Sequence, residues 1–281
     1  IIQHGTMTMV RRELLQRIGW SEWCITEDAE LGLRILDEGY ATTYIARSYG
    51  RGLMPDTFLD FKKQRSRWAF GAMQILRRHF DALIHGRDTG LTAGQRYHFV
   101  AGWLPWLADG FNLLVNLAAL AWSLVMVLFP RHIEPPLMLF SVLPLSLFLF
   151  KLVKLLHLYR ARVGATFTQT IAAAIAGLGL SHTVGSAMLS GFVNKNRPFF
   201  RTPKRTTRHA WLQSLAAARE EAVLMCGLWV AAFAVSSIPQ MDGDQPGLVG
   251  SPDLTVWVTV LLVQSIPYAA AVIVSLVSSL R

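Results

Sequence analysis

The sequence predicts an α/β segment followed by an α-helical transmembrane region with interfacial helices. Two observations support this fold class. Strand-like and helical patterns alternate over roughly the first 60 residues, and long uncharged apolar blocks fill much of the rest. The 281 residues are 52% hydrophobic and carry a net charge of +9, which is typical of a membrane protein with basic cytoplasmic loops. The charges lie in patches between apolar blocks, which argues against a nucleic-acid-binding protein.

The first segment reads as strand, helix, helix and strand. Residues 1–10 have strand-like content, and the helix that follows should end at Gly19. A second helix should begin after Thr26 as N-cap and end at Gly39, and "ATTYIA" should form a short strand. The chain starts at Ile1 without the pattern of a signal peptide, so we expect it to begin inside a domain.

Residues 57–80 predict a basic amphipathic helix. Phe58, Phe61, Trp68, Met73 and Leu76 lie among Lys62, Lys63, Arg65, Arg67, Arg77 and Arg78. Such a helix suits a membrane–water interface, and the alternative is a surface helix packed on the soluble segment.

Four apolar segments predict membrane spans. They are residues 111–129, 137–159, 222–238 and 254–280. Residues 163–193 are also uncharged, but basic clusters flank them on both sides. Because basic clusters favour the cytoplasm, we expect this segment to be interfacial or re-entrant.

Three places carry groups suited to chemistry. Glu27 and Asp28 open a helix, where carboxylates ordinarily serve as partners of the helix dipole. Gln64, Arg67 and Trp68 share one side of a helix, so a phosphate could pair with the guanidinium and a sugar could stack on the indole. An interfacial helix with a tryptophan anchor explains the same residues equally well.

The third place is the basic segment 197–208, "RPFFRTPKRTTR". It is either a cytoplasmic loop that attracts anionic lipid or a flap over an anionic ligand. The histidines show no metal-ligand spacing, and the two cysteines, Cys24 and Cys226, form no readable disulfide or metal pattern.

Together these places resemble the processive family 2 membrane glycosyltransferases, which include cellulose, hyaluronan and β-1,3-glucan synthases. The resemblance rests on "TED" at 26–28, then Q-x-x-R-W in "QRSRW" at 64–68, then membrane helices. "HGT" at 4–6 is similar to the turn of the acceptor segment. "FFRTPK" is similar to a gating loop of the form F-x-V-T-x-K, although Arg201 stands where the pattern has Val. The sequences "GQRYHFVAGWLPWLADG" and "RPFFRTPK" most resemble those of bacterial β-1,3-glucan synthases.

The resemblance implies three regions. Residues 1–56 would be the C-terminal part of a GT-A catalytic domain, and residues 57–98 an interfacial helix with its connector. Residues 99–281 would be a transmembrane channel with a gating loop near 195–208.

The resemblance also implies roles for single residues. Asp28 would be the general base that takes the proton of the acceptor hydroxyl. Trp68 would stack on the terminal sugar of the acceptor. The remaining implied residues are His4, Gly5, Thr6, Thr26 and Glu27 for the acceptor, and Gln64, Arg67, Thr202 and Lys204 for the UDP-sugar donor.

The resemblance implies Mg²⁺ or Mn²⁺ bound by a D-x-D pair upstream of TED. No such pair precedes residue 26, and the chain's one Asp-x-Asp, Asp242-Gly243-Asp244, lies in a predicted outer loop. We therefore expect the donor and metal half to lie in a preceding segment, and the 281 residues to be inactive without it.

Several alternatives stay open. The product could be cellulose, hyaluronan or a chitin-like polymer instead of a β-1,3-glucan made from UDP-glucose. A non-catalytic transport component would explain the membrane spans but not TED and Q-x-x-R-W. Arg201 and Arg205 have the spacing of a cyclic-dinucleotide motif, but we interpret them as loop charges. The resemblance and the basic loops place the protein in a bacterial inner membrane.

Overall fold

All regular secondary structure in the described residues is helical. The computed structural model describes residues 5, 7–45, 47, 49–50, 52–53, 55, 57–194, 216–238 and 252–279. Residues 8–10 and 41–45, where strands were expected, form neither helix nor strand. A strand needs a partner for its backbone hydrogen bonds, and the described part of the chain offers none. The α/β assignment of residues 1–56 therefore stays a prediction, as do the boundaries at 56 and 98.

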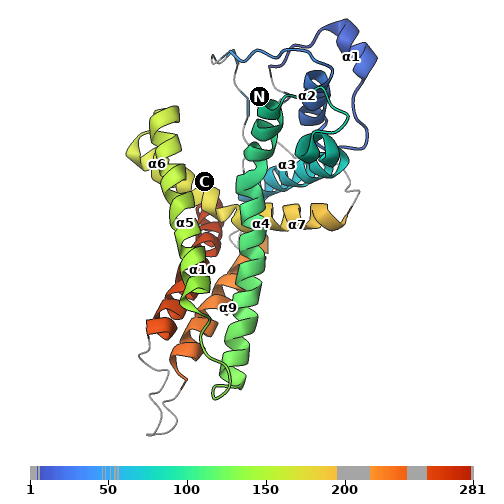
Figure 1. The fold of residues 1–281 in the computed structure, drawn as a ribbon. Helices are drawn as coiled ribbons and strands as arrows, with labels where there is room; N and C mark the ends of the chain where they lie inside the picture. Colours follow the sequence, from blue (N-terminus) through green and yellow to red (C-terminus); the bar gives the residue numbers. More distant parts are fainter. Residues whose placement is uncertain are drawn as a thin grey trace. The chain divides into compact units, whose positions relative to one another are not determined.

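The chain divides into two compact units, and each has its own packing. Unit 1 consists of Ile1–Gly110 and Thr183–Thr206, and unit 2 consists of Phe111–His182 and Thr207–Arg281. Helix α4 (Ala93–Leu128) contributes its first half to unit 1 and its second half to unit 2 (Figure 1).

In unit 1, α1 (Arg12–Ile18) and α2 (Glu27–Asp37) share a small apolar core of Leu14, Leu31 and Ile35. Gly19 ends α1 with a φ of 70°, which confirms the predicted stop. Thr26 is the residue before α2, as predicted, although its side chain makes no capping hydrogen bond.

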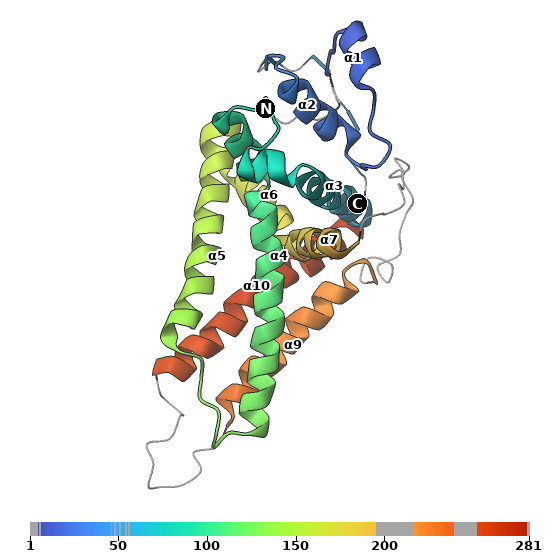
Figure 2. The ribbon, with the colours of Figure 1, turned by 45° about the vertical axis from the view of Figure 1, so that its right-hand side comes forward.

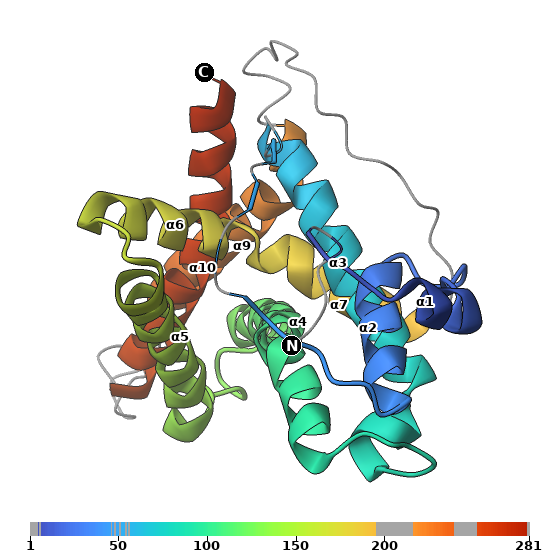
Figure 3. The ribbon, with the colours of Figure 1, turned by 90° about the horizontal axis from the view of Figure 1, so that it is seen from above.

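The predicted basic helix is confirmed as α3 (Phe58–Arg78). The Thr57 hydroxyl caps its start by accepting a hydrogen bond from the Asp60 N–H at 3.1 Å. The helix is half-exposed over its basic first turns and buried from Ala69 to Leu76. A short π-helical turn, η1 (Asp81–His85), follows, and α2 lies beside α3 in this unit (Figure 3).

Helix α7 (Ser181–Val193) packs its C-terminal end on α3. A Cβ at Gly191 would lie 2.6 Å from the Met73 Cβ, so the two helices approach closely there. Arg77 Nη1 donates to the carbonyl oxygens of Gly191 at 2.9 Å and Asn194 at 3.2 Å. These bonds satisfy carbonyls that the end of a helix leaves without partners.

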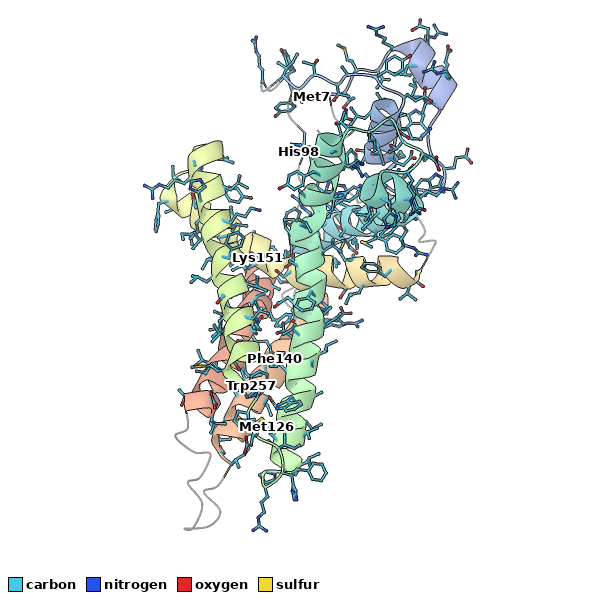
Figure 4. The ribbon with its side chains drawn as sticks, in the orientation of Figure 1. Met7, His98, Met126, Phe140, Lys151 and Trp257 are labelled. Carbon is cyan, nitrogen blue, oxygen red and sulfur yellow. The ribbon has the colours of Figure 1, made fainter. Side chains whose placement is uncertain are left out.

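Unit 2 is a helical bundle built around α10 (Pro252–Ser279), which packs against α9 (Arg219–Ser236), α6 (Phe167–Gly179) and α5 (Met138–Leu158) (Figure 2). A further π-helical turn, η2 (Tyr159–Val163), follows α5. Met126 of α4 and Trp257 of α10 belong to its apolar core (Figure 4).

Within the described residues, four helical segments are long and apolar enough to cross a membrane: Ala93–Leu128, Phe140–Ala161, Phe167–Val193 and Asp253–Ser278. Three of them contain most of a predicted span. The predicted span at 222–238 lies mostly within α9, which is not among the four because its first turn carries Arg219, Glu220 and Glu221. Residues 167–193 form two helices separated at Leu180. Their length and composition would also allow a membrane span, so the interfacial placement stays a prediction.

Candidate active site

Asp28 lies against the backbone of Gly5. A Cβ at Gly5 would be 2.7 Å from Asp28 Oδ2, and Gly5 has a φ of 70°. Asp28 is half-buried in the first turn of α2, where its Oδ1 also accepts the Ala29 N–H at 2.9 Å. The structure therefore brings Gly5 of the HGT segment next to the Asp28 carboxylate of TED, although the two residues are more than 20 positions apart in the sequence.

Thr26 lies against α3. A Cβ at Gly71 would overlap the Thr26 side chain, so only glycine allows this approach. Cys24 Sγ lies 3.4 Å from Thr26 Oγ1 and 4.0 Å from the Gly71 carbonyl oxygen. TED is thus packed on the helix that carries Q-x-x-R-W.

The side of α3 that meets Thr26 is the side that carries the Q-x-x-R-W residues. Gln64, Trp68 and Gly71 are four and three residues apart, and Arg67 precedes Gly71 by one turn. All three motif side chains are half-buried. The amide, the guanidinium and the indole thus lie on the side of α3 that Thr26 meets, and the Asp28 carboxylate follows Thr26 by two residues.

Arg65 covers one face of the Trp68 ring. Its guanidinium carbon lies 4.6 Å from the Trp68 ring centroid and 5.0 Å from that of Phe61. Such cation–π contacts hold an indole in a defined orientation. A sugar that stacks on Trp68 would use the other face.

A buried polar network around Glu30 holds α2 in place. Glu30 is 1% exposed and accepts hydrogen bonds from Ser21 and from Arg34 Nε, at 2.8 Å for the latter, and it lies 3.0 Å from His79 Nε2. Arg34 also donates to the carbonyl oxygens of Ile18 and Gly19. Arg34 thus ties α2 to the end of α1, and Glu30 ties α2 to His79 at the end of α3.

Two groups near the site have shifted pKa values. Burial acts to raise the pKa of Glu30, but the hydrogen bonds from His79, Ser21 and Arg34 together hold it below its usual value. Burial raises the pKa of the Cys24 thiol to about 11, so this thiol is not a nucleophile at neutral pH.

The remaining predicted site residues are only partly placed. Glu27 is half-buried beside Asp28 at the start of α2. His4, Thr6, Thr202 and Lys204 lie outside the described residues, as do Asp242 and Asp244. Among the described residues, no group of three or more His, Cys, Asp or Glu side chains is arranged to hold a metal ion.

The sequence patterns did not predict Gly71 and Gln74 as part of the site. Gln74 is 7% exposed and hydrogen-bonds to the backbone just before TED. The signal was present, because both residues continue the three- and four-residue spacing of Gln64 and Arg67 along α3. The sequence does not say that α2 covers this side of the helix.

These features combine a carboxylate, a polar helix face and apolar helices of membrane-spanning length in one chain. The chain belongs to the glycosyl transferase family group 2, whose family model matches residues 1–163. This family agrees with the family 2 glycosyltransferases that the motifs resemble.

Curated relatives include cellulose synthase catalytic subunits. The chain is 29% identical over 130 residues to cellulose synthase 1 catalytic subunit [UDP-forming] of Komagataeibacter xylinus, which is 46% of this chain and 16% of the relative. It is 35% identical over 98 residues to the enzyme of Komagataeibacter sucrofermentans, covering 34% of this chain and 12% of the relative. It is 34% identical over 119 residues to the enzyme of Pseudomonas fluorescens, which covers 42% of this chain and 16% of the relative.

The chain thus matches less than a fifth of the length of each of these relatives. No solved structure shows a significant match to it.

Proposed function

We propose that this chain provides the acceptor side and the membrane helices of an inverting, processive glycosyltransferase. The enzyme would polymerise UDP-glucose into a β-glucan, with β-1,3 linkage as the first candidate, and extrude the polymer between its own helices. The observation that carries the proposal is the contact of Asp28 with Gly5 next to the contact of Thr26 with the Q-x-x-R-W helix. The curated relatives are named as UDP-forming enzymes, which supports a UDP-sugar donor.

The reaction needs a base at the acceptor. Asp28 would take the proton of the acceptor hydroxyl while the hydroxyl oxygen attacks the anomeric carbon of the donor. The bond between that carbon and the UDP oxygen breaks, and UDP leaves with the electron pair. Attack from the side opposite to UDP inverts the anomeric carbon and gives a β-linkage.

The helix α3 would hold both reactants. Trp68 would stack on the terminal sugar of the growing polymer, with Glu27, Thr26 and the HGT segment around it. Gln64 and Arg67 would bind the diphosphate, where a guanidinium stabilises the charge that develops on UDP. Thr202 and Lys204 would close over the donor.

A divalent metal would support the departing diphosphate, as is general in this family. The described residues of this chain offer no donor set for it, so none of the steps above depends on a metal site in this part of the enzyme. The segments of membrane-spanning length and the family support a place in a bacterial inner membrane.

A cellulose-type synthase is the second candidate, because the curated relatives bear that name. The test is incorporation of radiolabelled UDP-glucose by membranes that contain the full-length protein, followed by digestion of the product. Release by a β-1,3-glucanase supports the first candidate, and release only by a β-1,4-glucanase supports the second. No incorporation from any UDP-sugar would favour a transport component.

Asp28→Asn should lower polymer synthesis at least about 100-fold, because the amide cannot accept the proton. Trp68→Ala should abolish long polymer by removing the stacking surface. Both variants should still be expressed and inserted into the membrane. Glu22→Gln, an exposed change six residues before Asp28, is the matched control and should keep wild-type activity. An active Asp28→Asn enzyme would contradict the assignment of the base.

A further inference from the structure

Gln74 is a buried side chain of α3 that holds the backbone just before TED. Its Oε1 accepts a hydrogen bond from the Ile25 N–H at 3.1 Å, and its Nε2 donates to the Trp23 carbonyl oxygen at 3.2 Å. The side chain is 7% exposed, so water competes little for these bonds. The Gln74 amide thus hydrogen-bonds to the carbonyl oxygen of Trp23 and to the N–H of Ile25, two residues later. A neighbouring strand would pair with the same two backbone groups.

Gly71 completes this contact one turn earlier on α3. Thr26 occupies the space that a side chain at position 71 would fill, and Cys24 lies close to the Gly71 carbonyl oxygen. Residues 23–26 therefore run along the surface of α3. Gln74 hydrogen-bonds to their backbone, and the absence of a side chain at Gly71 leaves room for Thr26. The chain then turns directly into α2, whose second residue is Asp28.

Trp68 and Arg67 are three and four residues before Gly71, on the same side of α3. The contacts at Gly71 and Gln74 thus fix the start of α2 relative to the helix that carries the indole and the guanidinium. A rotation or shift of residues 23–26 would move Asp28 without moving Trp68.

We propose that Gln74, together with Gly71, is a positioning residue that sets the distance between the Asp28 carboxylate and the acceptor sugar stacked on Trp68. The inference rests on the proposed function. In this role Gln74 would not contact a reactant directly. It acts by holding residues 23–26 on α3, so that the carboxylate meets the acceptor hydroxyl rather than a water molecule.

If residues 23–26 shift on α3, we expect the acceptor of the transferred sugar to change. In productive transfer, the sugar hydroxyl attacks the anomeric carbon, its proton passes to Asp28, and UDP leaves. With the base displaced from the polymer end, water takes the place of the sugar hydroxyl, and free sugar and UDP are formed. A misplacement of about 1 Å can cost a factor of about 100 in rate.

The experiment measures UDP release and sugar incorporation separately, in membranes that contain the full-length enzyme. Gln74→Leu removes both hydrogen bonds at similar volume. Gln74→Glu keeps an acceptor for the Ile25 N–H and loses the donor to the Trp23 carbonyl. Gln16→Leu, an exposed change of the same type on α1, is the matched control.

We expect Gln74→Leu to lower kcat for incorporation about 10- to 100-fold, with KM for the UDP-sugar within about twofold of wild type. The ratio of UDP released to sugar incorporated should rise, and Gln74→Glu should lie between Gln74→Leu and wild type. Gln16→Leu should match wild type in both products.

Hydrogen–deuterium exchange of the solubilised protein gives a readout that does not depend on activity. The Ile25 amide should exchange faster in Gln74→Leu than in wild type, while Gln74→Glu retains part of the protection. Unchanged exchange would overturn the inference, because Gln74 would then not hold this segment.

The outcomes separate the positioning role from the proposed function. An active wild type whose Gln74→Leu variant keeps its kcat and its product ratio overturns the positioning role alone. A lower rate with an unchanged product ratio also overturns it, because such a loss reflects less folded enzyme. A wild type without any UDP-sugar turnover overturns the proposed function, and the positioning role with it.

Discussion

At the scale of single residues, the candidate site depends on two close approaches of backbone to side chain. Gly5 meets the Asp28 carboxylate, and Gly71 meets Thr26. Sequence patterns predicted Asp28, Thr26 and Gly5 as members of one site. They did not predict Gly71 or Gln74, because a helical spacing shows which residues share a side but not which segment covers it.

Gly5→Ala should impair polymer synthesis by about tenfold or more, because its Cβ would push the Asp28 carboxylate out of place. Gly19→Ala is the control. Gly19 has the same φ of 70°, but no heavy atom lies within 4 Å of the place that an alanine methyl would take, so it reports backbone strain alone. Equal activities of the two variants in membranes would contradict the contact between Gly5 and Asp28.

Glu30 should make the stability of the protein depend on acid. Because its folded pKa is below the unfolded value of about 4.3, its stabilisation is present above that pH and is lost as the pH falls through the folded pKa. Glu30→Gln should destabilise the protein by about 1–3 kcal/mol at neutral pH.

The difference in thermal stability between wild type and Glu30→Gln should shrink as the pH falls below the unfolded pKa of about 4.3, because protonated Glu30 resembles Gln. Glu38→Gln, which removes the exposed Arg17–Glu38 pair, is the control and should have a smaller effect. A difference that does not change as the pH falls would show that folding does not lower the pKa of Glu30.

At the scale of elements, the sequence located helices better than it located their ends in the membrane region. The stop at Gly19 and the basic helix α3 were predicted and are confirmed, because glycine and amphipathic spacing act locally. Helix α4 begins at Ala93, well before the predicted span at 111, since apolar content alone does not mark where a helix starts.

The contact between α7 and α3 should be sensitive to one methyl group. Gly191→Ala places a Cβ 2.6 Å from that of Met73, and overpacking costs about 1–3 kcal/mol, more than the gain of about 0.5–1 kcal/mol in helix propensity. Gly94→Ala in α4 meets open space and should be neutral or stabilising. Thermal unfolding in detergent checks both, and equal stability of the two variants would contradict the close packing.

At the scale of the whole molecule, large apolar side chains of unit 2 are exposed. Phe150 of α5 is 66% exposed and Phe233 of α9 is 73% exposed, as expected for helices that face lipid. The protein should therefore stay in the membrane pellet after extraction with alkaline carbonate, whereas a peripheral protein is released. Release of this protein into the supernatant, detected by immunoblotting, would contradict a membrane-spanning region.

The sequence by itself determined the family motifs, the basic helix and the apolar segments, because each depends on residues that are close in the chain. The tertiary structure alone decided that Gly5 meets Asp28, that TED packs on α3, and that Gln74 holds the segment before it. These contacts join residues from about 20 to about 50 positions apart, and they depend on which helix faces pack together. A strand likewise needs a second strand for its backbone hydrogen bonds. The strand-like patterns at 8–10 and 41–45 therefore cannot by themselves determine whether a strand forms.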